Sequence, residues 1–466
     1  MIQYRDLLSD TICSPITAPG YSGVAVIRVS GEKSLEITKK FTNLKSEDIT
    51  SHKSYLRMFV GELDKKIDQV LITYFKKDKS FTGDETIEIS CHGNPLIINA
   101  IVNAYLNEGC RAAEKGEFSF RAYYNGKIDL IQAESIHQLV TTNNIEGSDS
   151  FLSQLQGRLS GEFKFVEDNL VLALSHLEAS IDFVEQEIET ANYQVVQEIL
   201  ALVKDKTEKL IDSYSVGKSL QGSFKVLLLG KTNVGKSSLF NKFVEKDRAI
   251  VTEIAGTTRD VITGQKFIGH NSVEFIDSAG LRETSDKIEK IGIEKSIEQI
   301  QKADLVLYLV DVTTPEENNL ENFLPIEKTH IVFNKIDLLD SEEDILQAKD
   351  KFLKSSGLDF SNDKVSFIST LEGNSIVELI LLLEKNIVQQ RDHKENNLVT
   401  QARHYNHLCE LNTNLKACFN LISIEESPDI LSQELQLGLS EVHQLLGKEY
   451  NDEVLDKIFS QFCIGK

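Results

Sequence analysis

Gly230-Lys-Thr-Asn-Val-Gly-Lys-Ser237 is the stretch that decides the fold of the middle of this chain. It comes directly after the strand-like run Lys225–Leu229, and a segment of helical pattern, Ser238–Lys242, follows it. A glycine-rich loop of this spacing between a strand and a helix is the P-loop pattern. The sequence therefore predicts a phosphate-binding loop at the carboxyl end of a β-strand.

The residue types in this loop match the chemistry of phosphate binding. Gly230 and Gly235 let the backbone wrap the phosphates with its N–H groups. Lys236 offers a positive charge to the β- and γ-phosphate oxygens, and Ser237 offers a hydroxyl to Mg²⁺. We therefore expect a nucleoside triphosphate and Mg²⁺ at this site.

Two further segments lie in the order that a GTPase requires. Asp277-Ser-Ala-Gly280 follows a strand-like run, so that Asp277 would reach Mg²⁺ through water and the Gly280 N–H would contact the γ-phosphate. Gly256-Thr-Thr-Arg-Asp260 lies between this segment and the P-loop. Within it, Thr258 is expected to supply the second hydroxyl to Mg²⁺.

Base recognition is predicted at two later strand ends. In Asn334-Lys-Ile-Asp337, the carboxylate of Asp337 can accept both the N1–H and the exocyclic amino group of guanine. Adenine would leave that carboxylate desolvated and unpaired at a cost of roughly 1–3 kcal/mol or more, so GTP should be preferred to ATP. Ser369-Thr-Leu371 is a weaker match and would present backbone N–H groups to the guanine oxygen.

The groups that would catalyse hydrolysis are not given by the pattern alone. Ras-type enzymes orient the attacking water with a Gln directly after the Asp-x-x-Gly segment, and this chain has Leu281 there. The nearest acidic candidates are Glu283, Asp286 and Glu289. The charge of an arginine finger could come from Arg259 or Arg282, or from a cation held by the amide oxygen of Asn233.

Short apolar runs separated by helical or loop segments predict a parallel sheet covered on both faces in this region. The runs are Phe224–Leu229, Val273–Ile276, Leu305–Val310, Ile331–Phe333 and Val365–Ile368. Helical patterns lie on both sides of this region. We therefore expect the P-loop domain to be inserted into one helical domain.

From Leu152 to Ile188, apolar residues recur at the α-helical period of about 3.6 residues. This stretch should form one long amphipathic helix, or two joined near Gly157 and Gly161, with its apolar face in a domain core. The first ~120 residues mix β-like runs such as Val24–Val29 with turn residues and indicate a compact α/β unit. The expected domains are 1–120, 121–217 (helical, first part), 218–383 (P-loop) and 384–466 (helical, second part).

Composition excludes several classes of protein. The 466 residues include 50 Lys and Arg against 72 Asp and Glu, a net charge of −22, so any contact with nucleic acid should be local or shared with a partner. No apolar run is long enough to span a membrane, and the N-terminus has no signal or transit pattern, so a cytoplasmic protein is expected. No Cys-x-x-Cys pair occurs, so the expectation is reduced thiols at Cys13, Cys91, Cys110, Cys409, Cys418 and Cys463.

Taken together, these residues resemble the MnmE (TrmE) family, bacterial GTPases that modify the wobble uridine of certain tRNAs. The resemblance covers nearly the whole chain, and its matches outside the P-loop domain separate it from other GTPases. They are Thr11-Ile12, Ile27–Gly31, Phe81–Glu85, Glu88–Gly93, Gly116–Phe118, Asn125–Leu130, Ala133-Glu134 and Cys463–Lys466. The fold class implied is α/β plus α, with an N-terminal α/β folate-binding domain, a central helical domain and an inserted Ras-like P-loop GTPase domain whose sheet is mostly parallel.

The resemblance also implies ligands and roles. Formyl-tetrahydrofolate would be bound by Arg28, Glu88, Lys127 and Lys466. A K⁺ ion in place of the arginine finger would be held by Asn233, Thr252, Ile254 and Thr257, while Glu289 would orient the water; Glu289, Lys236 and Asn233 are thus the implied catalytic residues. The implied GTP contacts are Asn233, Val234, Gly235, Lys236, Ser237, Ser238, Thr252, Glu253, Ile254, Ala255, Gly256, Thr257, Thr258, Asp277, Ser278, Ala279, Gly280, Asn334, Lys335, Asp337, Ser369, Thr370 and Leu371.

The family implies partners as well. Its N-terminal domains form a constant homodimer, its GTPase domains pair when GTP binds, and the FAD-containing MnmG shares the tRNA. Together the two proteins add a carboxymethylaminomethyl or aminomethyl group to C5 of the wobble uridine. The sequence leaves open which tRNAs are modified, whether glycine or ammonium is the nitrogen donor, the hydrolysis rate, the extent of domain movement, and the roles of Arg259, Arg282 and Cys463.

Several positions depart from the family pattern, although none removes an expected ligand. They are Thr232 for Pro, Ser278 for Thr, Asn94 for Gly, and Ser369-Thr-Leu371 for Ser-Ala-x. Two rival classes of GTPase fit the sequence less well. A ribosome-assembly GTPase would bring a basic RNA-binding module, and a membrane-remodelling GTPase would bring a lipid-contact segment; the sequence shows neither.

Overall fold

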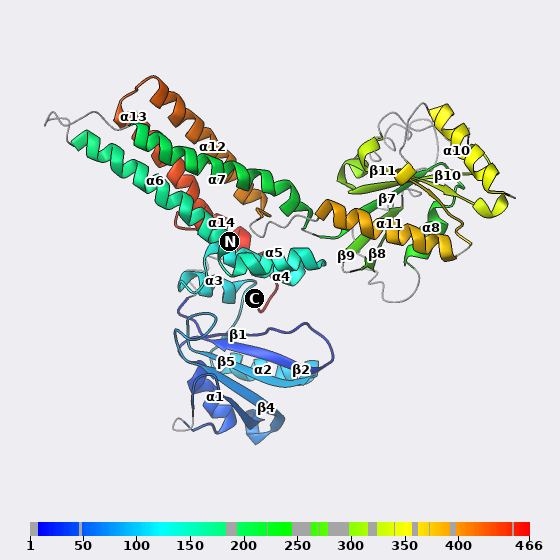
Figure 1. The fold of residues 1–466 in the computed structure, drawn as a ribbon. Helices are drawn as coiled ribbons and strands as arrows, with labels where there is room; N and C mark the ends of the chain where they lie inside the picture. The colour runs from blue at the N-terminus through cyan, green and yellow to red at the C-terminus, as the bar shows by residue number, and fades with distance from the viewer. Residues whose placement is uncertain are drawn as a thin grey trace, which may run out of the picture. The chain divides into compact units, whose positions relative to one another are not determined.

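The computed structural model forms two compact units: residues 1–140, 150–214 and 397–466 make the first, and residues 141–149 and 215–396 make the second. The second unit thus interrupts the first in sequence, as the colours of Figure 1 show. The residues described by the structure are 8–45, 49–182, 193–220, 222–244, 262–269, 271–277, 298–315, 324–339, 341–356, 362–371, 373–391, 398–449 and 452–466.

The N-terminal part of the first unit is a six-stranded sheet of order β3-β4-β5-β2-β1-β6. Neighbouring strands pair antiparallel except for β1 and β6, which are parallel. The strands are β1 Ile12–Pro15, β2 Ser22–Ser30, β3 Ser54–Val60, β4 Lys66–Phe75, β5 Thr86–Gly93 and β6 Arg111–Ala112. Buried residues alternate along the second half of β2, which is the pattern of a strand with one face in a core.

Two helices, α1 (Ser34–Thr42) and α2 (Pro95–Asn107), pack against this sheet. The sequence sets the start of α2, because the Asn94 side chain accepts a hydrogen bond from the Leu96 N–H and Pro95 occupies the first turn. The core between sheet and helices includes Ile27, Ile89 and Tyr105, all fully buried. One sheet face is thereby covered by helices.

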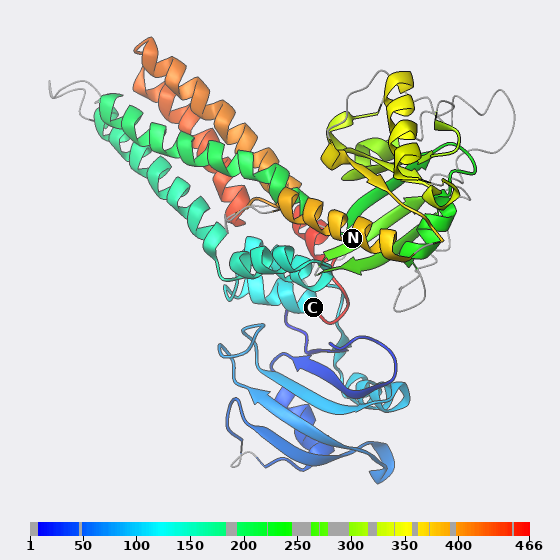
Figure 2. The ribbon, with the colours of Figure 1, turned by 45° about the vertical axis from the view of Figure 1, so that its right-hand side comes forward.

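The rest of the first unit is helical. Helices α6, α7, α12 and α13 share one apolar core and lie side by side in both views (Figures 1 and 2). The helices are α3 Glu117–Tyr124, α4 Leu130–Thr141, α5 Ile145–Leu155, α6 Arg158–Asp182, α7 Tyr193–Ser219, α12 Ala402–Ser423, α13 Pro428–Leu446 and α14 Asp452–Phe459. α13 begins with Pro428 in its first turn and ends at Gly447, which has φ +73°.

The predicted apolar stripe is a core face, as expected, and it belongs to two helices. Gly157 has φ +83° and separates α5 from α6, whereas Gly161 lies inside α6. Leu159, Leu170 and Leu177 are fully buried. Leu152 is the exception, because its side chain is exposed. The predicted continuation from 183 to 188 lies outside the described residues.

The second unit is built on another six-stranded sheet, of order β12-β11-β10-β7-β9-β8. All pairs are parallel except β8 with β9. The strands are β7 Phe224–Gly230, β8 Ile262–Ile268, β9 Asn271–Asp277, β10 Leu305–Asp311, β11 Thr329–Asn334 and β12 Val365–Phe367. Every residue of β10 and β11 is buried, as parallel strands covered on both faces require.

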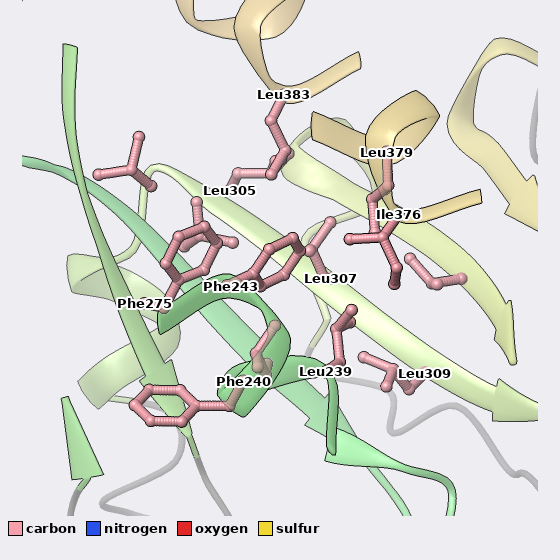
Figure 3. Packing of buried hydrophobic residues seen from close by; sticks show 14 of the residues in the cluster. Leu239, Phe240, Phe243, Phe275, Leu305, Leu307, Leu309, Ile376, Leu379 and Leu383 are labelled. Atoms are coloured by element: carbon pink, nitrogen blue, oxygen red, sulfur yellow. The ribbon is translucent and has the colours of Figure 1, made fainter. Parts of the chain in front are cut away.

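The unit also contains helices α8 (Lys236–Val244), α10 (Glu342–Ser356) and α11 (Gly373–Arg391), a helical segment at 298–302 and three short 3-10 helices. Figure 3 shows the core on one sheet face, where Phe243 of α8 stacks on Phe275 with ring centroids 4.2 Å apart. Leu379 and Leu383 of α11 close the same core. This packing fixes α8 against the sheet and therefore fixes the loop in front of it.

The predicted fold class is confirmed. The five predicted strands of the P-loop unit are β7, β9, β10, β11 and β12. β8, the strand that pairs antiparallel in this sheet, was not predicted, because an edge strand exposed to solvent carries no continuous apolar run. All six cysteines are free thiols, in agreement with the expectation.

Candidate nucleotide site and a second site in the N-terminal domain

The phosphate loop joins β7 to α8 in a conformation that its sequence dictates. Three of its residues have positive φ: Gly230 at +141°, Asn233 at +63° and Gly235 at +98°. Glycine takes such angles freely, and Asn is among the few other residues that tolerate them. The loop also leaves no room for a larger residue at Gly230, where an added Cβ would lie 2.5 Å from the Leu309 carbonyl oxygen.

Lys236 and Ser237 start α8 directly behind this loop. The Lys236 ammonium group is almost buried and donates to the carbonyl oxygens of Gly230, at 2.9 Å, and Lys231, at 2.6 Å. The Ser237 hydroxyl donates to Oδ2 of Asp277 at 2.9 Å. A cation, a hydroxyl and a carboxylate therefore meet at the N-terminus of a helix, where the helix dipole also favours anions.

These oxygen donors fit Mg²⁺. Magnesium is usually held by one or two protein oxygens together with waters and phosphate oxygens, so a full set of protein ligands is not expected. In the described part of the chain, no cluster of three or more His, Cys, Asp or Glu residues could hold a metal alone. Ser237 and the buried Asp277 supply the hard oxygen atoms that such a shared site needs.

Asn334 joins the phosphate loop to the last strand of the sheet. Its side chain is fully buried; Nδ2 donates to the Val234 carbonyl oxygen at 2.8 Å, and Oδ1 accepts from the Thr370 N–H at 3.2 Å. One amide thus holds two loops that lie more than 100 residues apart in sequence. The predicted phosphate and base segments therefore lie at one edge of the sheet.

Asp337 and Ser369 meet at the same edge. The Ser369 hydroxyl donates to Oδ1 of Asp337 at 2.5 Å, and the Leu371 N–H donates to the Ser369 hydroxyl at 3.2 Å. Leu371 is exposed. The structure thus brings the segments 334–337 and 369–371 together, as the sequence analysis expected. A free carboxylate oxygen beside backbone N–H groups can bind a base that presents both donors and acceptors.

Lys335 lies between Asn334 and Asp337 in sequence, and Asp311 of β10 binds its side chain. It has φ +68°, and its ammonium group lies 2.5 Å from Oδ2 of Asp311. Burial alone would raise the pKa of Asp311, but hydrogen bonds from Lys335 and Thr313 hold that pKa below its usual range. Asp311 therefore stays ionised at neutral pH. Asp311 was not among the predicted site residues, although it ends an apolar run just as Asp277 does.

Many predicted site residues lie outside the described residues. These are Thr252, Glu253, Ile254, Ala255, Gly256, Thr257, Thr258, Ser278, Ala279, Gly280 and Glu289, together with Leu281, Glu283, Asp286, Arg259 and Arg282. The remaining predicted nucleotide contacts lie in the phosphate loop, at Asp277, and in the segments 334–337 and 369–371, which we call the guanine loop after their predicted ligand. Ser238 is exposed on the first turn of α8.

In the N-terminal sheet, two of the predicted folate contacts form a cross-strand pair. Arg28 of β2 lies opposite Glu88 of β5, and its Nε and Nη2 donate to Oε1 of Glu88 at 3.0 and 2.8 Å. The guanidinium group also lies over two rings, with 5.3 Å to the centroid of Phe81 and 5.4 Å to that of Phe118. Both phenylalanines lie in segments that match the family, but neither was among the predicted contacts.

The other two predicted folate contacts lie near the same pair. The Phe118 N–H donates to the Lys466 carbonyl oxygen at 3.2 Å, and the tail is also held by a β-bridge between Lys115 and Ile464. Lys127 donates to the Asp78 carbonyl oxygen at 2.7 Å, in the loop that carries Phe81. Lys466 and Lys127 are therefore held by the segments that carry Phe118 and Phe81, the two rings beside Arg28. Cys463 is exposed on the tail.

Comparison with known proteins assigns the family. Residues 11–127 match the family model described as the GTP-binding protein TrmE N-terminus, and residues 130–463 match the MnmE helical domain. The chain is 38% identical over 471 residues to a Bdellovibrio bacteriovorus protein named tRNA modification GTPase MnmE, with 98% of each chain covered. A Fervidobacterium nodosum protein of the same name is 36% identical, with 99% of this chain and 98% of the relative covered.

The chain belongs to the MnmE family. The resemblance inferred from the residues is thus confirmed. Among solved structures, the G domain of the T. maritima FeoB iron transporter is 26% identical and covers 36% of this MnmE-family chain and 98% of its own, with a TM-score of 0.25. None of the helices in the described part of the chain has the length and apolar character of a membrane span.

Proposed function

We propose that this chain is a guanine-specific GTP hydrolase that acts in tRNA modification. The nucleotide part of the proposal is carried by Asn334, whose side chain joins the phosphate loop to the guanine loop and so makes one site of the two. The tRNA part rests on family membership and on the names of relatives that align over nearly the full chain.

The described residues have distinct parts in binding the nucleotide. Backbone N–H groups of the phosphate loop and the ammonium group of Lys236 would bind the phosphates, and Ser237 and Asp277 would hold Mg²⁺ directly and through water. Magnesium supplies charge neutralisation at the β- and γ-phosphate oxygens. Asp337, kept in place by Ser369, would accept the N1–H and amino group of guanine.

For hydrolysis we propose that Glu289 orients the attacking water, since Leu281 cannot. Asn233 would hold K⁺ together with Thr252, Ile254 and Thr257. The support for this role is that Asn233 stands inside the phosphate loop at φ +63° with an exposed side chain, where its amide oxygen is free to turn toward the phosphates. A cation there supplies the charge that an arginine finger supplies elsewhere.

We propose a folate site at Arg28, Glu88, Lys127 and Lys466. Folate carries carboxylates, which suit the cations, and a ring with adjacent N–H groups, which suits the Glu88 carboxylate. The formyl or methylene group of the folate would provide the one-carbon unit. The support is the pairing of Arg28 with Glu88 beside two aromatic rings, together with the contacts of Lys127 and Lys466 with the segments that carry those rings.

The family resemblance further supports a homodimer, a shared complex with MnmG and tRNA, and activity in the cytoplasm. The net charge of −22 agrees with a protein that shares its tRNA contact with a partner. In this proposal, GTP-driven pairing of GTPase domains changes the arrangement of the domains. The product is the carboxymethylaminomethyl or aminomethyl group at C5 of the wobble uridine.

The test is hydrolysis of GTP and ATP by the purified protein in matched KCl and NaCl buffers. We expect hydrolysis of GTP, little hydrolysis of ATP, and strong stimulation by K⁺, with light scattering showing pairing when GDP and aluminium fluoride are present. Glu289→Ala should abolish hydrolysis and leave GTP binding intact, and Asn233→Ala should remove the K⁺ dependence. Equal use of ATP would refute the guanine-specific site, and equal rates in both salts would refute the K⁺ role.

A further inference from the structure

Asp311 is the last residue of β10 and lies opposite Asn334 in the register of the parallel pair β10–β11. It is 8% exposed. Its Oδ1 accepts from the Thr313 N–H at 2.9 Å and from the Thr313 hydroxyl at 2.7 Å, and its Oδ2 accepts from the Lys335 ammonium group at 2.5 Å. Both oxygens of one carboxylate are therefore used at the sheet edge where the nucleotide residues lie.

Lys335 is the only residue between Asn334 and the short turn Ile336–Leu338 that carries Asp337. Its backbone is left-handed, with φ +68°, a conformation that is unfavourable for a residue with a Cβ atom. The ion pair with Asp311 restrains the side chain of this residue. The chain direction after Asn334, and with it the place of the Asp337 carboxylate, depends on that backbone conformation.

We propose that Asp311 is a positioning residue for guanine recognition: it holds the Lys335 ammonium group and thereby fixes the turn that presents Asp337 to the base. The inference rests on the proposed function, because it assumes that the turn binds guanine. Asp311 itself need not touch the nucleotide. It acts through Lys335, from a strand that carries none of the predicted guanine contacts.

The role requires a carboxylate. Two separate acceptors are in use, one for Thr313 and one for Lys335, and an amide offers only one oxygen. Asp311→Asn would therefore direct an NH₂ group at either the Lys335 ammonium group or the Thr313 N–H. The side chain keeps its size, so the change removes the ion pair with little change in packing.

A matched control lies at the other end of the same strand. Asp304 directly precedes β10 and accepts a hydrogen bond from the Lys225 N–H at 2.8 Å. Asp304→Asn also replaces a part-buried carboxylate that binds a backbone donor, at the opposite end of β10 from the guanine turn. A general loss of sheet stability should be similar in the two variants, whereas a loss of base positioning should occur only with Asp311→Asn.

The experiment is calorimetric titration of the full-length wild type, Asp311→Asn, Asp311→Glu and Asp304→Asn with GDP, IDP and ADP. IDP lacks the exocyclic amino group of guanine, so the ratio of the Kd for IDP to the Kd for GDP reports the contact of that group with Asp337. We expect Asp311→Asn to lower this ratio about fivefold or more, because a hydrogen bond to a charged group is lost from its aligned geometry. Asp304→Asn should keep the wild-type ratio, and Asp311→Glu should give an intermediate value.

An unchanged ratio in Asp311→Asn would overturn the inference, whatever the change in absolute affinity. If Asp311→Asn does not fold, Asp311→Glu carries the test, and a wild-type ratio in that variant would overturn the inference equally. A wild type that binds ADP as tightly as GDP would instead refute the proposed function. The two failures are therefore distinguishable in one set of titrations.

Discussion

Gly235 lies where the phosphate loop approaches Asn334, the last residue of β11. It has φ +98°, and a Cβ added there would overlap the side-chain amide of Asn334. That amide is the group that connects the two loops of the site. A methyl group at this position therefore acts on nucleotide binding in two ways, through backbone strain and through displacement of Asn334.

Gly235→Ala should weaken GDP binding by at least about tenfold, since the strain of a left-handed alanine is roughly 1–2 kcal/mol and the displaced Asn334 adds to it. Fluorescent GDP titration measures the effect. Gly222→Ala is the control, because Gly222 has a similar φ of +97° and no atom within 4 Å of an added Cβ. Equal affinities of Gly235→Ala and wild type would contradict the described packing.

At the scale of elements, α4 and α12 are joined by a buried charge cluster. Glu134 of α4 accepts from Arg403 Nε at 2.9 Å and lies 2.7 Å from Nε2 of His404, which is fully buried. Burial would raise the pKa of Glu134, but Arg403 and His404 outweigh it and lower the pKa to about 2. Burial lowers the pKa of His404 below its usual value, although the neighbouring Glu134 acts in the opposite direction.

Glu134→Gln should destabilise the first unit by about 3–5 kcal/mol at pH 7, because it leaves the part-buried Arg403 without its charge partner. The folded pKa of Glu134 lies below its unfolded value, so its contribution is complete above about pH 4.5 and is lost as the pH falls toward 2. Urea unfolding should therefore show that the difference in free energy of unfolding between wild type and variant becomes smaller below pH 4.5.

The control for this prediction is Glu441→Gln, which removes the half-exposed pair between Glu441 and His407. A part-exposed pair is worth roughly 1 kcal/mol or less. A gap for Glu134→Gln that is no larger than that of Glu441→Gln, or one that stays constant between pH 7 and pH 3, would show that the buried cluster does not stabilise the unit as described.

The short segment 141–149 belongs to the second unit and contacts the residues just before β7 and at the start of β9. The Asn144 side chain is buried; its Nδ2 donates to the Leu220 carbonyl oxygen at 2.9 Å, and its Oδ1 accepts from the Gly147 N–H at 2.5 Å. The same residue forms a β-bridge with Asn271, the first residue of β9. β9 ends at Asp277, so this segment touches the strand that carries a predicted Mg²⁺ contact.

Asn144→Ala should destabilise the second unit by about 2–4 kcal/mol, since two buried backbone groups lose their partner. Thermal unfolding monitored by circular dichroism would measure it. Thr142→Val is the matched control in the same segment, because the hydroxyl of Thr142 makes only long hydrogen bonds of 3.5 Å. Similar melting temperatures for Asn144→Ala and Thr142→Val would contradict a stabilising role for the Asn144 hydrogen bonds.

Particular elements show what sequence can predict here. Local spacing predicted the P-loop and the strands β7, β10 and β11, because buried parallel strands and glycine-rich loops leave patterns within a few residues. It did not predict the ion pair of Asp311 with Lys335, because these two residues lie 24 positions apart in sequence. Nor did it predict the cation–π contacts of Arg28 with Phe81 and Phe118, since only the folded sheet brings those residues together.

At the scale of the whole molecule, the chain should unfold in parts that respond differently to ligand. The nucleotide residues belong to the unit formed by residues 141–149 and 215–396. A ligand that binds only the folded state stabilises it by about 2.7 kcal/mol at 100 times its Kd. We expect differential scanning calorimetry to show two unfolding transitions. GDP should raise the midpoint temperature of one transition and leave that of the other unchanged.

Lys236→Met provides the control for this calorimetric prediction. It removes the buried ammonium group of the phosphate loop. GDP should then no longer raise the midpoint temperature of either transition, while both transitions remain. A shift of both transitions by the same amount in the wild type would contradict a nucleotide site confined to one unit. Loss of both transitions in the variant would show instead that Lys236 is needed for folding.

The central claim is that GTP hydrolysis by this chain serves tRNA modification. The most direct measurement is mass spectrometry of the wobble uridine in tRNA from source cells that lack the chain, and from the same cells given back the wild type or Lys236→Met. We predict that the carboxymethylaminomethyl or aminomethyl uridine disappears on deletion, returns with the wild type and does not return with Lys236→Met. An unchanged level of the modified uridine in the deletion cells would contradict the account.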